Sequence, residues 1–196
     1  METNESVRKI AVFASGTGTN AENIIRYFQD VRCGIEVALV VCNKAGAGVI
    51  ERATSLGVPV RVMAAAEIRN PEQMLAVLDE YEIELIVLAG FLLMVPDFIL
   101  GRYAGRIINI HPSLLPKFGG KGMYGRHVHE AVVASGETET GITVHHVTDK
   151  CDEGGVIFQA SVAVDPSDDA ETVEAKVHGL ERKHFARVIR EFMEGI

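Results

Sequence analysis

The sequence contains no tryptophan and only three cysteines among its 196 residues. Cys33, Cys42 and Cys151 are odd in number and lack the close spacing of a zinc site, so neither a disulfide framework nor a metal centre is predicted. Because thiols outside such frameworks are typical of a reducing compartment, we expect a cytoplasmic protein.

Basic side chains are also in short supply, with 19 Lys and Arg against 27 Asp and Glu and a net charge of −8. Such a chain is not attracted over long range by nucleic acid or anionic bilayers, so we expect neither partner. The most apolar run, from Leu85 to Pro96, is shorter than the roughly 20 residues that span a bilayer. The first eight residues lack the basic start and apolar stretch of a signal peptide, so export is not expected.

The composition is otherwise that of a folded protein, with 47% hydrophobic and 23% charged residues in a length that suits one core. Short β-branched runs alternate with helix-length amphipathic segments through the first two thirds of the chain. This order is typical of a parallel sheet covered by helices on both faces. We therefore predict a single domain over residues 1–196, with an α/β fold built on a doubly wound, mostly parallel sheet of Rossmann type.

The element pattern also predicts how the chain ends. The link between the last two strands is too short for a parallel crossover, so this pair should be antiparallel, and a long helix should follow it. Pro71 and Pro96 suit first-turn positions of their helices. The predicted strands are Lys9–Ala14, Ile35–Cys42, Val58–Val62, Ile83–Ala89, Arg106–Asn109, Ile142–Val147 and Val156–Val164. The predicted helices are Asn20–Gln29, Ala47–Leu56, Pro71–Glu80, Pro96–Tyr103, Val128–Ala134 and Asp169–Met193.

A glycine-containing loop, Ser15-Gly-Thr-Gly-Thr-Asn20, follows the first predicted strand and opens the first predicted helix. Backbone N–H groups and the positive end of a helix can hold a phosphate at such a place. With Ala21 in the third position, the loop also satisfies the G-x-G-x-x-G/A dinucleotide pattern. The acid that an NAD ribose requires is missing after the second strand. Lys44 stands there and could face a 2′-phosphate, so an NADP-type nucleotide-binding protein remains an alternative. A plain tight turn is the other interpretation.

Asn109 and His111 stand two residues apart at the end of the fifth predicted strand, so both side chains leave the same face. The amide offers a neutral donor and the imidazole a proton that can move near pH 7. Together they suit a developing oxyanion beside a proton transfer, although bonds to the loop backbone are the alternative. Asp152, or its neighbours Asp149 and Glu153, could reach the same cleft from the link between the last two strands. The histidines taken as structural or exposed are His127, His129, His145, His146, His178 and His184.

The segment Asn109-Ile-His-Pro-Ser-Leu-Leu-Pro116, with Asp152 later and ahead of Gly154-Gly155, resembles the formyltetrahydrofolate-dependent formyltransferases. Within that group, the chain is similar to the phosphoribosylglycinamide formyltransferase family over roughly residues 8 to 193. The segments that carry this likeness are Ser15–Asn20, Leu88-Ala-Gly-Phe91, Lys121-Gly-Met-Tyr-Gly125 and Gly141-Ile-Thr-Val-His145.

The resemblance implies transfer of a formyl group from 10-formyltetrahydrofolate to the amine of glycinamide ribonucleotide in purine biosynthesis, without a metal. It places the amine substrate in a half of about residues 8–90 and the folate and the chemistry in a half of about 91–193. A formyltetrahydrofolate hydrolase, in which water replaces the amine, is the nearest alternative. We expect a monomer or a homodimer.

The resemblance also implies roles for single residues. Asn109 would hydrogen-bond the oxyanion, His111 would stabilise it and move a proton, and Asp152 would support His111 and assist proton transfer through water. The substrate-binding positions implied are Gly18, Thr19, Asn20 and Glu181. The folate-contacting positions implied are Arg69, Leu92, Leu93, Met94, Val95, Asn109, Asp149 and Asp152. Relatives carry Arg where this chain has Leu93, so a side-chain contact is lost there while backbone contacts remain.

Overall fold

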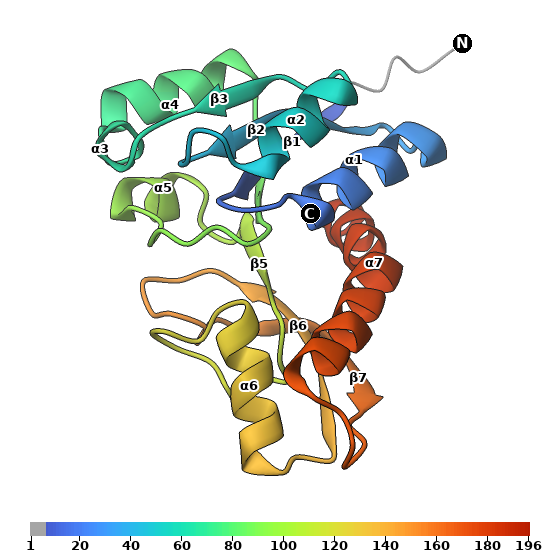
Figure 1. Cartoon of the computed structure of the whole chain (residues 1–196). Helices are drawn as coiled ribbons and strands as arrows, with labels where there is room; N and C mark the ends of the chain where they lie inside the picture. Colours follow the sequence, from blue (N-terminus) through green and yellow to red (C-terminus); the bar gives the residue numbers. More distant parts are fainter. Residues whose placement is uncertain (1–6) are drawn as a thin grey trace. The chain divides into compact units, whose positions relative to one another are not determined.

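The computed structural model describes residues 7–196, so most of the stretch considered for a signal peptide lies outside the described residues. Two compact units divide the chain, the first ending at Ile107 and the second running from Ile108 to Ile196. The strands are β1 Arg8–Ala14, β2 Ile35–Cys42, β3 Val60–Val62, β4 Leu85–Leu88, β5 Ile107–His111, β6 Glu139–His146 and β7 Val156–Ala163 (Figure 1). The helices are α1 Thr19–Val31, α2 Gly48–Ser55, α3 Ala65–Ile68, α4 Pro71–Glu80, α5 Asp97–Arg102, α6 Arg126–Ser135 and α7 Ala170–Glu194.

The first unit is built on four parallel strands in the order β3-β2-β1-β4. Val12 in the central strand pairs with Val40 on one side and Val87 on the other, and all three side chains are fully buried. Burial of consecutive residues means that helices cover both faces of the sheet. Because parallel crossovers are right-handed, α1 and α2 lie on one face and α4 lies on the other. The predicted doubly wound parallel arrangement is confirmed.

The second unit carries the antiparallel strands in the order β5-β6-β7. Helix α7 packs on β6 and β7 and contacts α6 (Figure 1). Its apolar stripe is fully or almost fully buried, which explains why one helix of 25 residues stays in place on the sheet. The stripe consists of Val173, Val177, Phe185, Val188, Ile189 and Met193. The predicted antiparallel pair and long last helix are confirmed.

Several element ends differ from the prediction because pairing partners, which a local pattern does not show, decide them. β6 begins at Glu139 because Glu139 and Thr140 pair with β7, although the charged Glu139 does not favour a strand. β5 continues to His111 because β6 supplies partners up to Thr143. The four-residue α3 was not predicted. Pro71 occupies the first turn of α4 as expected, whereas Pro96 is the N-cap of α5.

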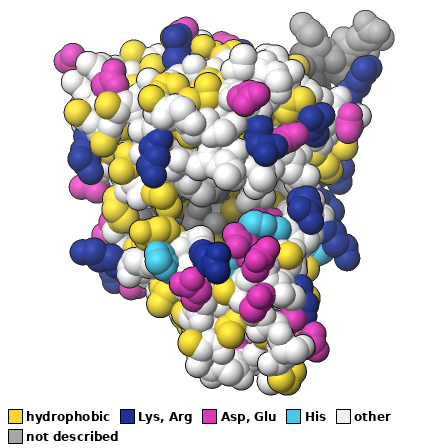
Figure 2. Space-filling model, viewed as in Figure 1, with side chains coloured by type: hydrophobic (Ala, Val, Ile, Leu, Met, Phe, Trp, Pro, Cys, Tyr) yellow, Lys and Arg dark blue, Asp and Glu magenta, His cyan; other side chains and the backbone are white. Residues whose placement is uncertain are grey.

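Charged side chains of both signs are interspersed on the face that Figure 2 shows, as the composition leads one to expect. No helix among the described residues has the length and apolar character that crossing a membrane requires.

Candidate active site

Asn109 and His111 lie on β5, directly opposite His145 and Thr143 of β6. The backbone that follows His111 is fixed by Thr143, a fully buried residue whose hydroxyl donates to the Ser113 carbonyl at 2.7 Å and accepts the Leu115 N–H at 3.0 Å. The turn away from the strand is therefore anchored immediately beyond the histidine.

His111 is 4% exposed and faces an acceptor at each ring nitrogen. Nε2 lies 2.8 Å from the Phe118 carbonyl oxygen, and Nδ1 lies 3.5 Å from Oδ2 of Asp152. A ring that carried a proton on both nitrogens would thus have an acceptor on each side. Phe118 and Asp152 have φ angles of 54° and 58°, a left-handed conformation that side-chain-bearing residues rarely adopt and that occurs preferentially at functional sites.

The carboxylate of Asp152 lies between two imidazoles. Besides facing His111, Oδ2 accepts the Gly120 N–H at 2.8 Å, and Oδ1 lies 3.7 Å from Nε2 of His145. The loop that carries Asp152 is shaped by Gly154, where a Cβ atom would lie 1.7 Å from the His146 carbonyl oxygen. Only glycine permits this close approach of two backbone segments.

His145 holds the amide of Asn109. Nδ1 of His145 lies 2.8 Å from the His146 carbonyl oxygen, so this nitrogen carries the proton, and Nε2 accepts an N–H from Nδ2 of Asn109 at 3.0 Å. Burial lowers the pKa of His145, although the His146 carbonyl and Asp152 act in the opposite direction, and the ring is neutral near pH 7. An amide nitrogen has two N–H groups, so one remains to meet a ligand.

The interaction of His145 with the predicted residues was missed by sequence analysis, which treated this histidine as structural or exposed. The signal that could have found it is the register of β5 against β6. That register depends on how the long connection through α6 returns the chain to the sheet, which the sequence does not reveal.

Cys151, next to Asp152, is not equipped as a nucleophile. Its Sγ lies 3.6 Å from Oδ2 of Asp152, and burial together with that carboxylate raises the pKa of the thiol. A raised pKa keeps the sulfur protonated at neutral pH. The two other acids of the loop, Asp149 and Glu153, are exposed.

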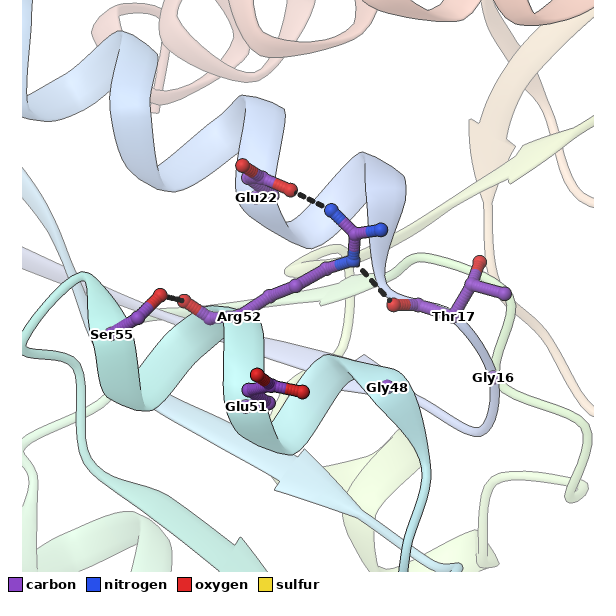
Figure 3. Close-up of a pocket in the computed structure, with 7 residues that line it drawn as sticks. All are labelled: Gly16, Thr17, Glu22, Gly48, Glu51, Arg52 and Ser55. Carbon is purple, nitrogen blue, oxygen red and sulfur yellow. Dashed lines mark hydrogen bonds and ion pairs between the residues drawn. The ribbon is translucent and has the colours of Figure 1, made fainter.

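In the first unit, the glycine loop runs from β1 into α1. Gly18 is the N-cap of α1 with a φ of 79°, and a Cβ atom there would lie 2.5 Å from Cα of Val49. The Gly16 carbonyl accepts the Val49 N–H at 3.2 Å, so the loop packs directly on α2. The residues that line the hollow between this loop and α2 are Gly16, Thr17, Glu22, Gly48, Glu51, Arg52 and Ser55 (Figure 3).

Comparison with known proteins decides the family, because a model described as formyl transferase matches residues 8–189. The chain belongs to the formyl transferase family. A phosphoribosylglycinamide formyltransferase of Bacillus subtilis is 37% identical over 191 residues, which are 95% of each protein.

Solved structures of the formyl transferase family share the fold. Glycinamide ribonucleotide transformylase 1 from Symbiobacterium toebii matches with a TM-score of 0.88 and 32% identity, over 98% of this chain and 90% of that one. Phosphoribosylglycinamide formyltransferase from Bacillus halodurans matches with a TM-score of 0.86 and 35% identity, over 95% of both chains. The resemblance inferred from the motifs is thereby confirmed, and so is the predicted fold class.

The remaining substrate- and folate-binding positions implied by the resemblance lie on several different elements. Leu92–Val95 follows β4, and its first N–H donates to the hydroxyl of buried Ser15 at 2.9 Å, which ties this segment to the glycine loop. Arg69 caps the end of α3 and is exposed. Glu181 is 6% exposed on α7, with Oε2 3.9 Å from Nε2 of His178.

The structure thus brings Asn109, His111 and Asp152 together around His145 in the second unit. Gly18–Asn20, Arg69 and Leu92–Val95 belong to the first unit. The described residues contain no cluster of three or more His, Cys, Asp or Glu side chains that could hold a metal ion.

Proposed function

We propose that this chain transfers the formyl group of 10-formyltetrahydrofolate to the amine of glycinamide ribonucleotide, giving formylglycinamide ribonucleotide and tetrahydrofolate in purine biosynthesis. The observation that carries the proposal is the cluster in which Asp152 lies 3.5 Å from His111 and Asn109 is held by His145. Asn109 supplies a neutral hydrogen-bond donor, His111 a proton that can be transferred, and Asp152 a fixed negative charge. Acyl transfer to an amine requires these three groups.

Each residue of the cluster has a distinct task in this reaction. As the amine nitrogen bonds to the formyl carbon, the second N–H of Asn109 donates to the developing oxyanion. His111 stabilises the oxyanion and relays the proton that the amine gives up, with Asp152 assisting this transfer through water. When the bond between the formyl carbon and the folate nitrogen breaks, that nitrogen takes up the proton, so charge and protons balance.

Residues of the first unit, together with Glu181 and Asp149 of the second, bind the substrates in this proposal. Gly18, Thr19 and Asn20 hold the phosphate of the ribonucleotide at the N-terminus of α1, where backbone N–H groups and the helix dipole favour an anion. Glu181 contacts the ribose, and Leu92–Val95, Asp149 and Arg69 contact the folate. Because this chain has Leu93 where relatives carry Arg, backbone groups of Leu92–Val95 contact the pterin.

A formyltetrahydrofolate hydrolase would use the same three residues, and the glycine loop is what argues against it. Hydrolysis by water does not require a binding site for a substrate phosphate. The glycine loop, which we assign to the phosphate, is packed so closely on α2 that a side chain at Gly18 would clash with Val49. An NADP-type protein would leave the Asn109, His111 and Asp152 cluster without a task.

The deciding experiment follows consumption of 10-formyltetrahydrofolate by the purified protein with glycinamide ribonucleotide, with glycinamide riboside, or with water alone. We expect consumption that depends on the ribonucleotide, with the riboside a much poorer acceptor. A charge-assisted phosphate site loses several hydrogen bonds of about 1.5–3 kcal/mol each when the phosphate is absent. Equal consumption without acceptor would establish the hydrolase instead, and binding of NADPH would support the nucleotide-binding alternative.

The compartment and the assembly are part of the same proposal. None of the three cysteines is paired, which fits a reducing cytoplasm. We propose a monomer or a homodimer, and light scattering during size-exclusion chromatography distinguishes the two from larger assemblies.

A further inference from the structure

Arg52 of α2 joins the two sides of the glycine loop. Its Nε donates to the Thr17 carbonyl oxygen at 3.0 Å, and its Nη1 pairs with the carboxylate of Glu22 in the first turn of α1. Figure 3 shows the guanidinium lying between these two partners, which flank Gly18–Asn20. No motif in the sequence pointed to Arg52.

The contact with Thr17 fixes the direction of a donor. In a planar trans peptide the carbonyl and the following N–H point in opposite directions. Because Arg52 holds the Thr17 carbonyl toward α2, the Gly18 N–H points away from α2. The Gly16 carbonyl is held toward α2 in the same way, because it accepts the Val49 N–H at 3.2 Å. The Thr17 N–H therefore also points away from α2, on the same side of the loop as the Gly18 N–H. Successive N–H groups that converge in this manner form an anion-binding nest.

The contact with Glu22 removes a charge conflict. A carboxylate in the first turn of α1 would repel a phosphate bound at the same helix end. Glu22 is ionised, because hydrogen bonds from Arg26 and then Arg52 lower the pKa of its carboxyl. Arg26 pairs with Oε1 and Arg52 with Oε2, so the two guanidinium groups more than compensate the carboxylate.

We propose that Arg52 is a positioning residue for the phosphate of the formyl acceptor: it aims the Gly18 N–H at the phosphate and neutralises Glu22. The inference rests on the proposed function, since it names the residue that shapes the phosphate site of that reaction. Arg52 acts through the loop and is not itself a catalytic residue.

The test compares Arg52→Met with Arg26→Met, a matched control that removes one arginine from Glu22 and leaves the Thr17 carbonyl untouched. For each protein, kcat/KM is measured with glycinamide ribonucleotide and with glycinamide riboside, and inorganic phosphate is titrated as a competitor. We expect Arg52→Met to lower the ratio of the two kcat/KM values roughly tenfold and to weaken phosphate inhibition similarly, as the loss of one charge-assisted contact does. Arg26→Met should change the ratio by less than about threefold, the scale of an exposed helix pair.

Two further variants separate the two tasks. Arg52→Lys keeps the positive charge but lacks the forked geometry of the guanidinium. Its ratio of kcat/KM for ribonucleotide and riboside should therefore lie between those of Arg52→Met and the wild type. Adding Glu22→Gln to Arg52→Met should recover the part that is due to charge.

Two outcomes would overturn the inference. One is an unchanged ratio in Arg52→Met, which includes an equal loss with both acceptors, and the other is the same fall of the ratio in Arg26→Met. A wild-type protein that does not distinguish the ribonucleotide from the riboside would instead contradict the proposed function.

Discussion

Oδ2 of Asp152 lies 3.5 Å from Nδ1 of His111 and accepts the Gly120 N–H at 2.8 Å, so one carboxylate oxygen connects the buried imidazole to the backbone at Gly120. Asp152→Asn keeps the shape of this side chain but removes its negative charge. We expect kcat to fall by about 10²-fold or more, the size of a lost acid–base contribution, with little change in the free energy of unfolding.

Steady-state kinetics and thermal melting of the purified variant check this expectation. Glu153→Gln is the matched control, because Glu153 is an exposed acid of the same loop. Its effect on kcat should be small. Near-normal turnover in Asp152→Asn would contradict the role assigned to the carboxylate.

Replacing Asn109 tests the oxyanion contact. Asn109→Leu removes both N–H groups of the amide, one of which is donated to Nε2 of His145. We expect a loss of about 3 kcal/mol or more of transition-state stabilisation in kcat/KM, while the affinity for a folate analogue falls much less. A loss of activity only in proportion to a drop in Tm would show that Asn109 merely braces the loop.

The pH dependence of stability should reveal His145. Burial lowers the pKa of this imidazole below its ordinary 6.5, and it does the same for His129. In the interval between the folded and the ordinary value the unfolded chain binds more protons, so the free energy of unfolding rises with pH. The full stability is therefore present above about pH 6.5 and is lost as the pH falls below that value.

We expect Tm to decrease between about pH 7 and pH 5, and less steeply in His145→Asn than in the wild type. Activity should fall in the same interval, because a protonated Nε2 no longer accepts the Asn109 N–H. His127→Asn is the control, since that side chain is 64% exposed. The same slope in His145→Asn and the wild type would rule out His145 as a contributor.

The sequence was sufficient for the features that depend on local chemistry. The apolar runs of β1 and β2 and the alternation with amphipathic helices predicted the parallel sheet, and the spacing of Asn109 and His111 placed both on one strand face. What it could not supply are contacts set by register and tertiary packing. His145 reaches Asn109 only through the pairing of β5 with β6, and Arg52 reaches Thr17 across 35 positions of sequence.

The packing of the glycine loop on α2 leads to the last prediction, for Gly18→Ala. Gly18 has a φ of 79°, and a Cβ atom there would lie 2.5 Å from both Cα and Cβ of Val49, so the added methyl is opposed by backbone conformation and by a rigid neighbour. The left-handed conformation alone costs about 1–2 kcal/mol for a residue with a side chain, and relief of the clash must move the loop off α2. We expect the free energy of unfolding to fall by at least that amount and KM for glycinamide ribonucleotide to rise.

Gly16→Ala is the matched control two residues earlier in the same loop. A Cβ atom at Gly16 meets no other atom within 4 Å, so stability should change by no more than about 0.5 kcal/mol. Urea unfolding of both variants, together with KM for the ribonucleotide, separates the two positions. If Gly18→Ala were as stable as Gly16→Ala and bound the ribonucleotide as well, the loop would not depend on its contact with Val49, and the geometry assigned to the phosphate site would be wrong.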